Sequence, residues 1–96
     1  MRPSEALSHN RALIRALVAS CKATNPRIFG SVAIAKDTDN SDLDLLVDAL
    51  PGATLFDLGE LQISLEEALG VPVDLLTPGD LPDKLRSAIL SQAIPV

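Results

Sequence analysis

The segment from Ile28 to Asp48 constrains the fold of this chain more than any other, because it holds two short apolar runs separated by a polar loop. The first run ends in a Gly30-Ser31 dipeptide. The second alternates with a period of two, which predicts a strand with one apolar face and one partly acidic face. Its apolar positions are Leu43, Leu45 and Val47, and Asp42, Asp44, Leu46 and Asp48 point the other way. A strand with only a structural role has little reason to carry so many carboxylates on one face.

Periodic apolar residues and stop signals predict the elements around this segment. Asn25-Pro26 is expected to stop a first amphipathic helix, because the residue before a proline avoids the helical conformation. Thr54 with Asp57 three residues on is a capping-box pattern, and Gly70 fits just past the end of the helix that Thr54 begins. The expected elements are a helix over 4–23, a strand over 27–31, a helical turn over 32–35, a strand over 42–48, a helix over 54–69, a strand over 71–76 and a last helix between Asp80 and Pro95.

This order, α-β-α-β-α-β-α, predicts an α/β (α+β) fold with a small three-stranded mixed sheet flanked by helices. The connection between the second and third strands is long and contains a helix, which suits a parallel crossover. The first and second strands are joined by a shorter loop, which suits an antiparallel pair. Asp74 lies about as far into the third strand as Asp44 lies into the second. The topology therefore brings these two carboxylates, with Asp42 and the Gly30-Ser31 turn, to one edge of the sheet.

Carboxylates gathered in one small site repel each other unless a cation neutralises them. Oxygen ligands favour a hard metal such as Mg²⁺, which proteins typically hold with one or two carboxylates plus substrate phosphates. We therefore predict that Asp42 and Asp44 bind metal, and that Asp74 binds a second ion or deprotonates an attacking hydroxyl group. The backbone amides of Gly30 and Ser31, with the Ser31 hydroxyl, are predicted to hold the phosphates of a nucleotide at the start of the helical turn.

The overall charge and composition narrow the range of partners. The chain has 13 acidic and 8 basic residues and a net charge of −5, which argues against general nucleic-acid binding and permits a basic protein partner. Its two aromatic residues, Phe29 and Phe56, cannot form a ladder for stacking bases. The single cysteine, Cys21, excludes an internal disulfide and a Cys-type zinc site, and favours the reducing cytoplasm. No apolar run reaches the roughly 20 residues of a membrane span, and the N-terminus lacks the pattern of a signal peptide.

Several polar residues outside this constellation are expected to be solvated. Asp37 and Asp39 fall in the loop between the first two strands, and Asp48 falls at the end of the second strand. Arg11 and Arg15 share one face of the first helix, which is expected to face solvent, with contact to an acidic partner as the alternative.

Two motif halves carry a resemblance to a known family. Gly30-Ser31-Val32-Ala33 is followed by Ser41-Asp42-Leu43-Asp44-Leu45, with nine residues between Ala33 and Leu43. This pattern resembles the signature of the minimal nucleotidyltransferases (MNT) of the DNA polymerase β superfamily. That signature runs Gly-Ser-x-Ala-Arg-Gly, five residues, Ser-Asp-x-Asp-Leu and then a third Asp on a later strand. Val73-Asp74-Leu75 is similar to the context of that third Asp, and the resemblance extends over nearly the whole chain.

The resemblance implies a single minimal nucleotidyltransferase domain over residues 1–96, acting as the antitoxin beside a HEPN-domain RNase toxin. It implies transfer of AMP from ATP to a toxin side chain, expected to be a tyrosine, with one or two Mg²⁺ ions. It also implies a hetero-oligomer with the toxin in the cytoplasm, with no direct binding to nucleic acid or membrane. By position, Gly30 and Ser31 are implied to bind the nucleotide. Asp42, Asp44 and Asp74 are implied to be the catalytic and metal-binding residues.

The chain departs from the family pattern at Ile34-Ala35, where Arg-Gly is usual. An Arg close to a triphosphate stabilises charge and Ile cannot, and Ala resists the backbone angles that Gly adopts freely. The alternative hypothesis is therefore a catalytically weakened nucleotidyltransferase fold that inhibits the toxin sterically. Transfer to a small molecule such as an aminoglycoside is a third option, although enzymes of that kind usually add a domain for the acceptor.

Overall fold

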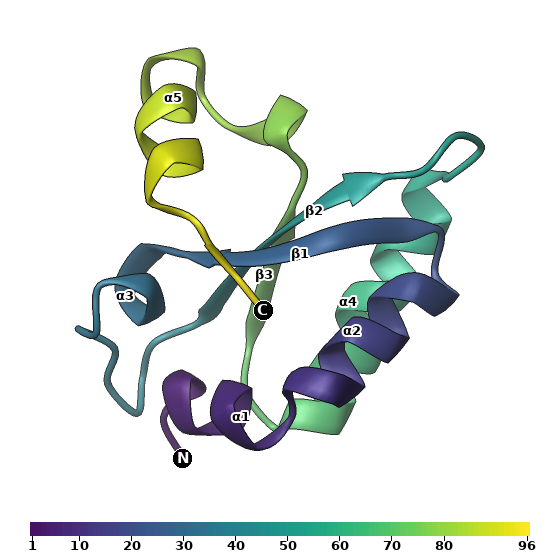
Figure 1. The fold of residues 1–96 in the computed structure, drawn as a ribbon. Coiled ribbons are helices and arrows are strands. Elements are labelled where there is room, and N and C mark those ends of the chain that lie inside the picture. Colours follow the sequence, from purple (N-terminus) through teal and green to yellow (C-terminus); the bar gives the residue numbers. More distant parts are fainter.

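A mixed sheet of four strands forms the centre of the computed structural model, which describes all 96 residues (Figure 1). The strands are β1 (Ala23–Phe29), β2 (Leu43–Ala49), β3 (Val73–Leu76) and β4 (Ile94–Pro95), in the order β3-β2-β1-β4. The helices are α1 (Pro3–His9), α2 (Arg11–Ser20), α3 (Gly30–Ala33), α4 (Leu55–Leu69) and α5 (Asp83–Gln92), with a 3₁₀ turn, η1 (Pro78–Asp80), before α5. No helix combines the length and the apolar character that crossing a membrane requires.

The predicted class, α/β (α+β) with a mixed sheet flanked by helices, is confirmed with one strand more than expected. β1 and β2 pair antiparallel, and β2 and β3 pair parallel, as the loop lengths predict. The additional strand β4 pairs antiparallel with β1, with Ile28 opposite Ile94. Pro95 favours an extended residue before it, so the chain leaves the last helix at Gln92 and meets the free edge of β1.

The predicted first helix over 4–23 is two helices in the structure. α1 ends and α2 begins at Asn10, whose φ of −136° is not helical. Its side-chain Nδ2 donates a hydrogen bond to the carbonyl oxygen of Ala6 at 2.8 Å. An Asn side chain can compete with the backbone for such bonds, which is why Asn is a weak residue inside helices.

The expected boundary between the first helix and the first strand is also shifted. β1 begins at Ala23, so Asn25-Pro26 lies inside the strand rather than after a helix. Asn25 has a φ of 55°, and the register of β1 against β2 shifts between Thr24 and Arg27. The dipeptide therefore forms a β-bulge, which tolerates a proline that a regular ladder would exclude.

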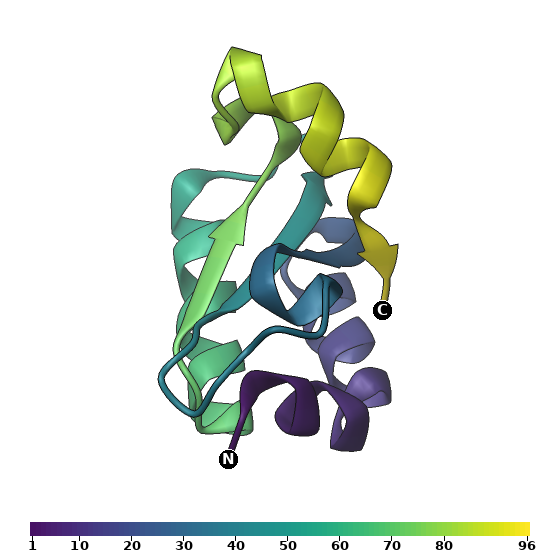
Figure 2. The same ribbon diagram turned by 90° about the vertical axis from the view of Figure 1, so that its left-hand side faces the viewer.

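Helices α2 and α4 cover one face of the sheet and close the core (Figures 1 and 2). Leu43, Leu45 and Val47 of β2 are fully buried on this closed face, as their alternation predicts. α4 begins with the predicted capping box and ends at Gly70, whose φ of 70° is left-handed. The buried residues that the two helices contribute are Ile14, Val18, Leu61, Leu65 and Leu69.

The other face of the sheet is open by comparison (Figure 2). η1 and α5 lie over part of it, and no residue of α5 is buried. Leu46 of β2 points to this open face, as predicted, and is nevertheless fully buried, because η1 packs against β2. The two faces thus differ in how much structure covers them.

The segment before α5 differs from its prediction. Asp80 does not cap the last helix, since α5 begins at Asp83. Asp80 instead closes the η1 turn, where its Oδ2 accepts hydrogen bonds from the N–H and the hydroxyl of Thr77 at 3.0 and 2.9 Å. Arg86 of α5 donates from Nε to the carbonyl oxygen of Pro78 at 2.9 Å, which ties the helix to this turn.

Candidate functional site

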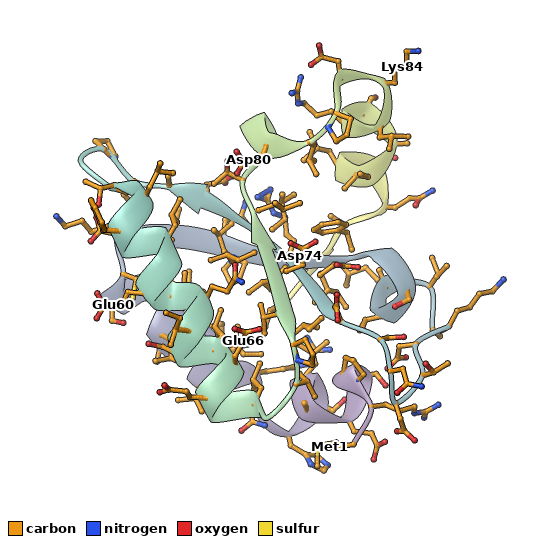
Figure 3. All side chains as sticks on the ribbon, turned by 180° about the vertical axis from the view of Figure 1, so that it is seen from behind. Met1, Glu60, Glu66, Asp74, Asp80 and Lys84 are labelled. Atoms are coloured by element: carbon orange, nitrogen blue, oxygen red, sulfur yellow. The ribbon has the colours of Figure 1, made fainter.

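Three strands each bring one residue into a single row on the open face of the sheet. Phe29 of β1 lies opposite Asp44 of β2, and Asp44 lies opposite Asp74 of β3. Residues directly opposite on neighbouring strands point to the same face, and this face is the one turned away from Leu43 and Leu45. Figure 3 shows Asp74 midway along β3. The structure therefore brings Asp44 and Asp74 together, as the topology predicts.

The Gly30-Ser31 turn lies directly against this row. A Cβ atom at residue 30 would overlap Oδ2 of Asp44 and lie 3.0 Å from its Cγ, so only a glycine leaves room for that carboxylate. Gly30 also has a φ of 71°, a left-handed conformation that residues with a Cβ rarely adopt. It is the first residue of α3, which starts two residues earlier than the predicted turn over 32–35. The Gly30-Ser31 motif marks this turn in the sequence. The steric reason for a glycine at residue 30 is seen only in the structure, where Asp44 lies beside it.

The surroundings of Asp44 disfavour its negative charge. Burial, followed by the charges of Asp74 and Asp42, raises the pKa of the Asp44 carboxyl to about 6. Asp42 directly precedes β2, and both Asp42 and Asp74 are exposed. Asp42 and Asp74 are therefore close enough to Asp44 to act on it electrostatically.

The chemistry of this row fits a divalent cation. Carboxylate oxygen is a ligand that Mg²⁺ prefers, and a cation beside Asp44 and Asp74 would favour the charged form of Asp44 that burial and then repulsion from Asp74 and Asp42 disfavour. As the side chains lie, no group of three or more His, Cys, Asp or Glu residues is arranged to hold a metal ion, and no pocket surrounds the row. A site of one or two carboxylates completed by substrate phosphates fits these residues better than a closed protein cage does.

The turn after α3 has a conformation that suits glycine, although it holds Ala35. Ala35 has a φ of 58°, and its N–H donates to the carbonyl oxygen of Val32 at 3.2 Å. A residue with a Cβ loses about 1–2 kcal/mol in this left-handed region, so the predicted resistance of Ala is a real local strain. Ile34, next to it, is 55% exposed and brings no positive charge to the turn.

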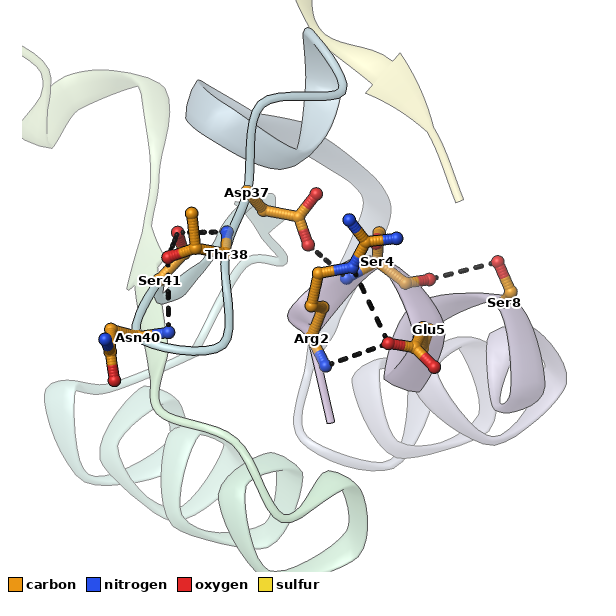
Figure 4. Close-up of polar contacts among 8 residues, drawn as sticks. All are labelled: Arg2, Ser4, Glu5, Ser8, Asp37, Thr38, Asn40 and Ser41. Atoms are coloured by element: carbon orange, nitrogen blue, oxygen red, sulfur yellow. Dashed lines mark hydrogen bonds and ion pairs between the residues drawn. The ribbon is translucent and has the colours of Figure 1, made fainter.

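One aspartate of the loop between β1 and β2 is buried, which contradicts its predicted solvation. Asp37 is 7% exposed, and its Oδ2 accepts a hydrogen bond from the backbone N–H of Ser4 at 2.9 Å (Figure 4). This bond is the main reason that the pKa of the Asp37 carboxyl is lowered. Asp39 is exposed, as predicted. No local pattern signals the buried contact, because Ser4 lies at the start of α1, far away in the sequence.

The far end of β2 holds an ion pair that sequence reasoning missed. Asp48, predicted to be solvated, is half-buried and accepts hydrogen bonds from Nη2 of Arg27 at 2.8 Å and from Nδ2 of Asn25 at 3.0 Å. The Arg27 side chain is 14% exposed, and its Nε is buried without a partner. Asp48 thus holds the bulge of β1 against β2, and its role in this structure is to support the sheet.

The mixed sheet and its acidic row define a nucleotidyltransferase fold, and comparisons with known proteins agree. Residues 22–96 match the model of the polymerase beta nucleotidyltransferase family. The chain therefore belongs to this family. Over 69 residues it is 42% identical to a Methanocaldococcus jannaschii protein provisionally named protein adenylyltransferase MJ0435, a match that covers 72% of this chain and 74% of that protein.

Solved structures confirm the resemblance to the minimal nucleotidyltransferases. One, described provisionally as a minimal nucleotidyltransferase, has a TM-score of 0.87 and 41% identity, and covers 97% of this chain and 95% of that one. A chain of a toxin–antitoxin complex with AMP-PNP has a TM-score of 0.75 and 26% identity, over 90% of this chain and 71% of that one. A complex of a tri-AMPylated Shewanella oneidensis HEPN toxin with its MNT antitoxin shares the fold, with a TM-score of 0.68 and 23% identity over 92% of this chain and 69% of that one.

Proposed function

We propose that this chain is an antitoxin that transfers AMP from ATP to a tyrosine of a HEPN-type RNase toxin in a Mg²⁺-dependent reaction. The observation that carries the proposal is the row of Asp44 and Asp74 with Gly30 packed against it. The name of the relative MJ0435 supports transfer of an adenylyl group to a protein. The AMP-PNP complex and the tri-AMPylated HEPN toxin support the nucleotide and the kind of acceptor.

The residues of the row receive roles from their chemistry. We assign Asp42, Asp44 and Asp74 to hold Mg²⁺, which neutralises phosphate charge in displacements at phosphorus when it is bound. Gly30 and Ser31 begin α3, and we assign their backbone amides to the phosphates of ATP. Because residue 30 has no side chain, the carboxylate of Asp44 can lie against the turn, and Mg²⁺ held by that carboxylate would be next to phosphates bound at the turn.

In the proposed transfer, the hydroxyl oxygen of the toxin tyrosine forms a bond to the α-phosphorus of ATP. The bond from that phosphorus to the oxygen bridging the β-phosphate breaks, and pyrophosphate leaves with its electron pair. We assign Asp74, which is exposed, to accept the tyrosine proton; where Asp74 instead holds a second ion, the proton passes to solvent. An open surface without a pocket suits a protein acceptor better than a small molecule such as an aminoglycoside.

A catalytically weakened binding module is the second candidate, and the turn after α3 favours it. Ile34 lacks the positive charge of an Arg, and Ala35 strains a position that suits Gly. In this case the chain neutralises the toxin by covering it, and the carboxylates of the row are dispensable for neutralisation.

Intact-mass measurement of the toxin tests the proposal. The chain is incubated with a HEPN-type RNase toxin, ATP and Mg²⁺, and we expect the toxin mass to rise by whole AMP units. The Asp42→Asn, Asp44→Asn double variant should leave the mass unchanged. No addition by the wild-type chain, with an active homologue as positive control, would contradict transfer.

The same double variant separates the two candidates in an RNase assay. If it inhibits the toxin as well as the wild-type chain does, steric binding is the function. If inhibition is lost while the complex still forms, transfer is the function. The Ile34→Arg, Ala35→Gly double variant should transfer AMP faster than the wild type, because it restores the usual pair of the family signature.

A further inference from the structure

Helix α4 carries an apolar stripe that faces away from the molecule. Its core side is formed by Leu61, Leu65 and Leu69, whereas Phe56 and Ile63 are 88% and 58% exposed. Spacing places four residues on the outer side of the helix, at i, i+4, i+7 and i+11. They are Phe56, Glu60, Ile63 and Glu67, which are all exposed. One of the two aromatic residues of the chain is therefore almost fully in solvent.

Helix α2 lies beside α4 on the closed face of the sheet and has a different outer surface (Figures 1 and 2). Ile14 and Val18 form its buried side. Its solvent side carries small residues spaced four and three apart, flanked by two arginines. These are Ala12, Ala16 and Ala19, with Arg11 and Arg15, and all five are exposed. The exposed side of α2 thus carries mostly alanines, with Leu13 (41% exposed) beside them, whereas α4 carries the protruding side chains of Phe56 and Ile63.

The two helices also carry opposite charge. α2 contains two arginines and no acidic residue, and α4 contains acidic residues and no basic one. Asp57 is used in the cap of α4, and Glu66 accepts a hydrogen bond from the N–H of Val73 at 3.0 Å. Glu60, Glu67 and Arg11 take part in none of the three ion pairs of the chain, whereas Nη1 of Arg15 donates a hydrogen bond to the carbonyl oxygen of Val96 at 3.2 Å. Figure 3 shows Glu66 directed toward β3 and Glu60 on the opposite side of the helix.

We propose that this two-helix face, formed by the outer sides of α2 and α4, is where a second copy of the chain docks. A twofold axis in the interface, parallel to the helices and between them, places α2 of each copy on α4 of the other. Arg11 of one copy then meets Glu60 and Glu67 of the other, and Arg15 joins this contact when its side chain releases the exposed carbonyl of Val96. Phe56 and Ile63 of each copy lie over the alanine surface of its partner. The charge and shape of this face are thus complementary to the same face of a second copy.

This docking leaves the acidic row free in both copies. α2 and α4 cover the closed face of the sheet, whereas Asp44 and Asp74 point to the open face. The inference therefore goes beyond the proposed transfer and does not depend on it. α4 is about 22 Å long at 1.5 Å per residue, so the buried area is near the lower limit of specific interfaces, roughly 1,000 Å², and we expect a micromolar dissociation constant.

Sedimentation equilibrium of the chain over a concentration series tests the dimer. We expect the average mass to rise from that of a monomer to that of a dimer. The Phe56→Ser, Ile63→Ser double variant should raise the dissociation constant at least about tenfold, because it removes the central apolar contacts. Leu85→Ser is the matched control, since Leu85 is an exposed apolar residue of α5 with 53% exposure and lies outside this face. A wild-type chain that stays monomeric at every concentration overturns the proposal.

Charge reversal gives a second, more specific test. The Arg11→Glu, Arg15→Glu variant and the Glu60→Lys, Glu67→Lys variant should each be monomeric, because like charges then face each other. Mixing the two variants should restore a mixed dimer, since each acidic helix then meets a basic one. Circular dichroism of each variant confirms that it is folded. A dimer that survives both reversals, or a mixture that stays monomeric, overturns the assigned face. A third result would also overturn the assigned face. If the wild-type chain is monomeric and its Phe56→Ser variant loses binding to the HEPN partner, the partner and not a second copy occupies this face.

Discussion

The two faces of the sheet share the strand β2 and differ in what that strand offers to each. On the closed face, Leu43, Leu45 and Val47 are fully buried under α2 and α4. On the open face, Asp44 is half-buried and carries a raised pKa, and the cover is one short turn and a helix without a buried residue. Packing is concentrated on one side of the strand and charge on the other.

The difference shows how a domain this small can hold a repulsive site. The burial of Asp44 and the charges of Asp74 and Asp42 beside it cost free energy, and the closed face supplies the apolar burial that offsets this cost. Because side chains alternate along β2, the residues that pack the core and the residues that form the acidic site are different residues of one strand. Variants of the two faces should therefore have different and separable effects.

The largest expected effect on stability comes from truncating the closed face. Leu45→Ala leaves a cavity under α2 and α4, and we expect the free energy of unfolding to fall by about 3–5 kcal/mol. Leu46→Ala removes the same atoms from an equally buried position on the open face. The thin cover there can move into the space, so the expected loss is about 2 kcal/mol. Urea denaturation measures both values, and equal losses would show that the two faces are packed alike.

Asp44→Asn should weaken function while it strengthens the fold. The folded-state pKa of Asp44 is raised, so the metal-free folded protein binds a proton more readily than the unfolded chain, and stability falls as the pH rises from about 4 to about 6. The Asp44→Asn variant lacks this dependence of stability on pH. With allowance for solvent screening, we expect it to be on the order of 1 kcal/mol more stable than the wild type at pH 7, and unable to transfer AMP. Urea denaturation at several pH values checks the sign, and a less stable variant would contradict it.

Asp37→Ala should loosen the loop that connects the two motif halves. Asp37 holds this loop to the N-terminus of α1, so we expect the amides of residues 34–41 to exchange about tenfold faster with solvent in the variant. Asp39→Ala removes the same charge from an exposed position of the same loop and should change little. Ser4→Ala keeps the backbone donor and loses only the Ser4 side chain, so its effect should be smaller than that of Asp37→Ala.

The pH dependence of this loop contact has the opposite sign to that of Asp44. The folded-state pKa of Asp37 is lowered below its ordinary value of 3.8. Its contribution to stability is therefore complete above that value and is lost as the pH falls toward the folded-state pKa. Hydrogen exchange of the wild-type loop at decreasing pH, corrected for intrinsic rates, should approach that of Asp37→Ala.

Ala35→Gly should have the smallest effect on the free energy of unfolding, and we expect it to stabilise the fold. Relief of the left-handed strain contributes about 1–2 kcal/mol, and the greater entropy of unfolded Gly offsets up to about 1 kcal/mol, which leaves a gain of about 0.5 kcal/mol. Ala33→Gly, inside α3, is the matched control and should destabilise by about 0.5–1 kcal/mol. A thermal melt of both variants tests the comparison, and a loss of stability in Ala35→Gly would show that the strain is absent.

The parts of this structure that the sequence predicts are those with local signals. The alternation of β2 and the capping box of α4 each lie within one segment, and loop lengths set the directions of the first three strands. Contacts between distant segments lack such signals. The bond from Ser4 to Asp37, the ion pair of Arg27 with Asp48 and the pairing of β4 all depend on where the folded chain places its parts.

The close approach of Gly30 to Asp44 has a consequence for how such a site can change over time. A side chain at residue 30 would displace the carboxylate, whereas a smaller residue at 44 would release residue 30 from that steric demand. The two positions are therefore epistatic, and the order of their substitution matters. A lineage that no longer needs the carboxylates of the site can substitute Asp44 first and Gly30 later. In the reverse order, substitution of Gly30 displaces the Asp44 carboxylate and disables the site in one step. Loss of this glycine is thus evidence that a descendant chain has already passed through the first of these changes.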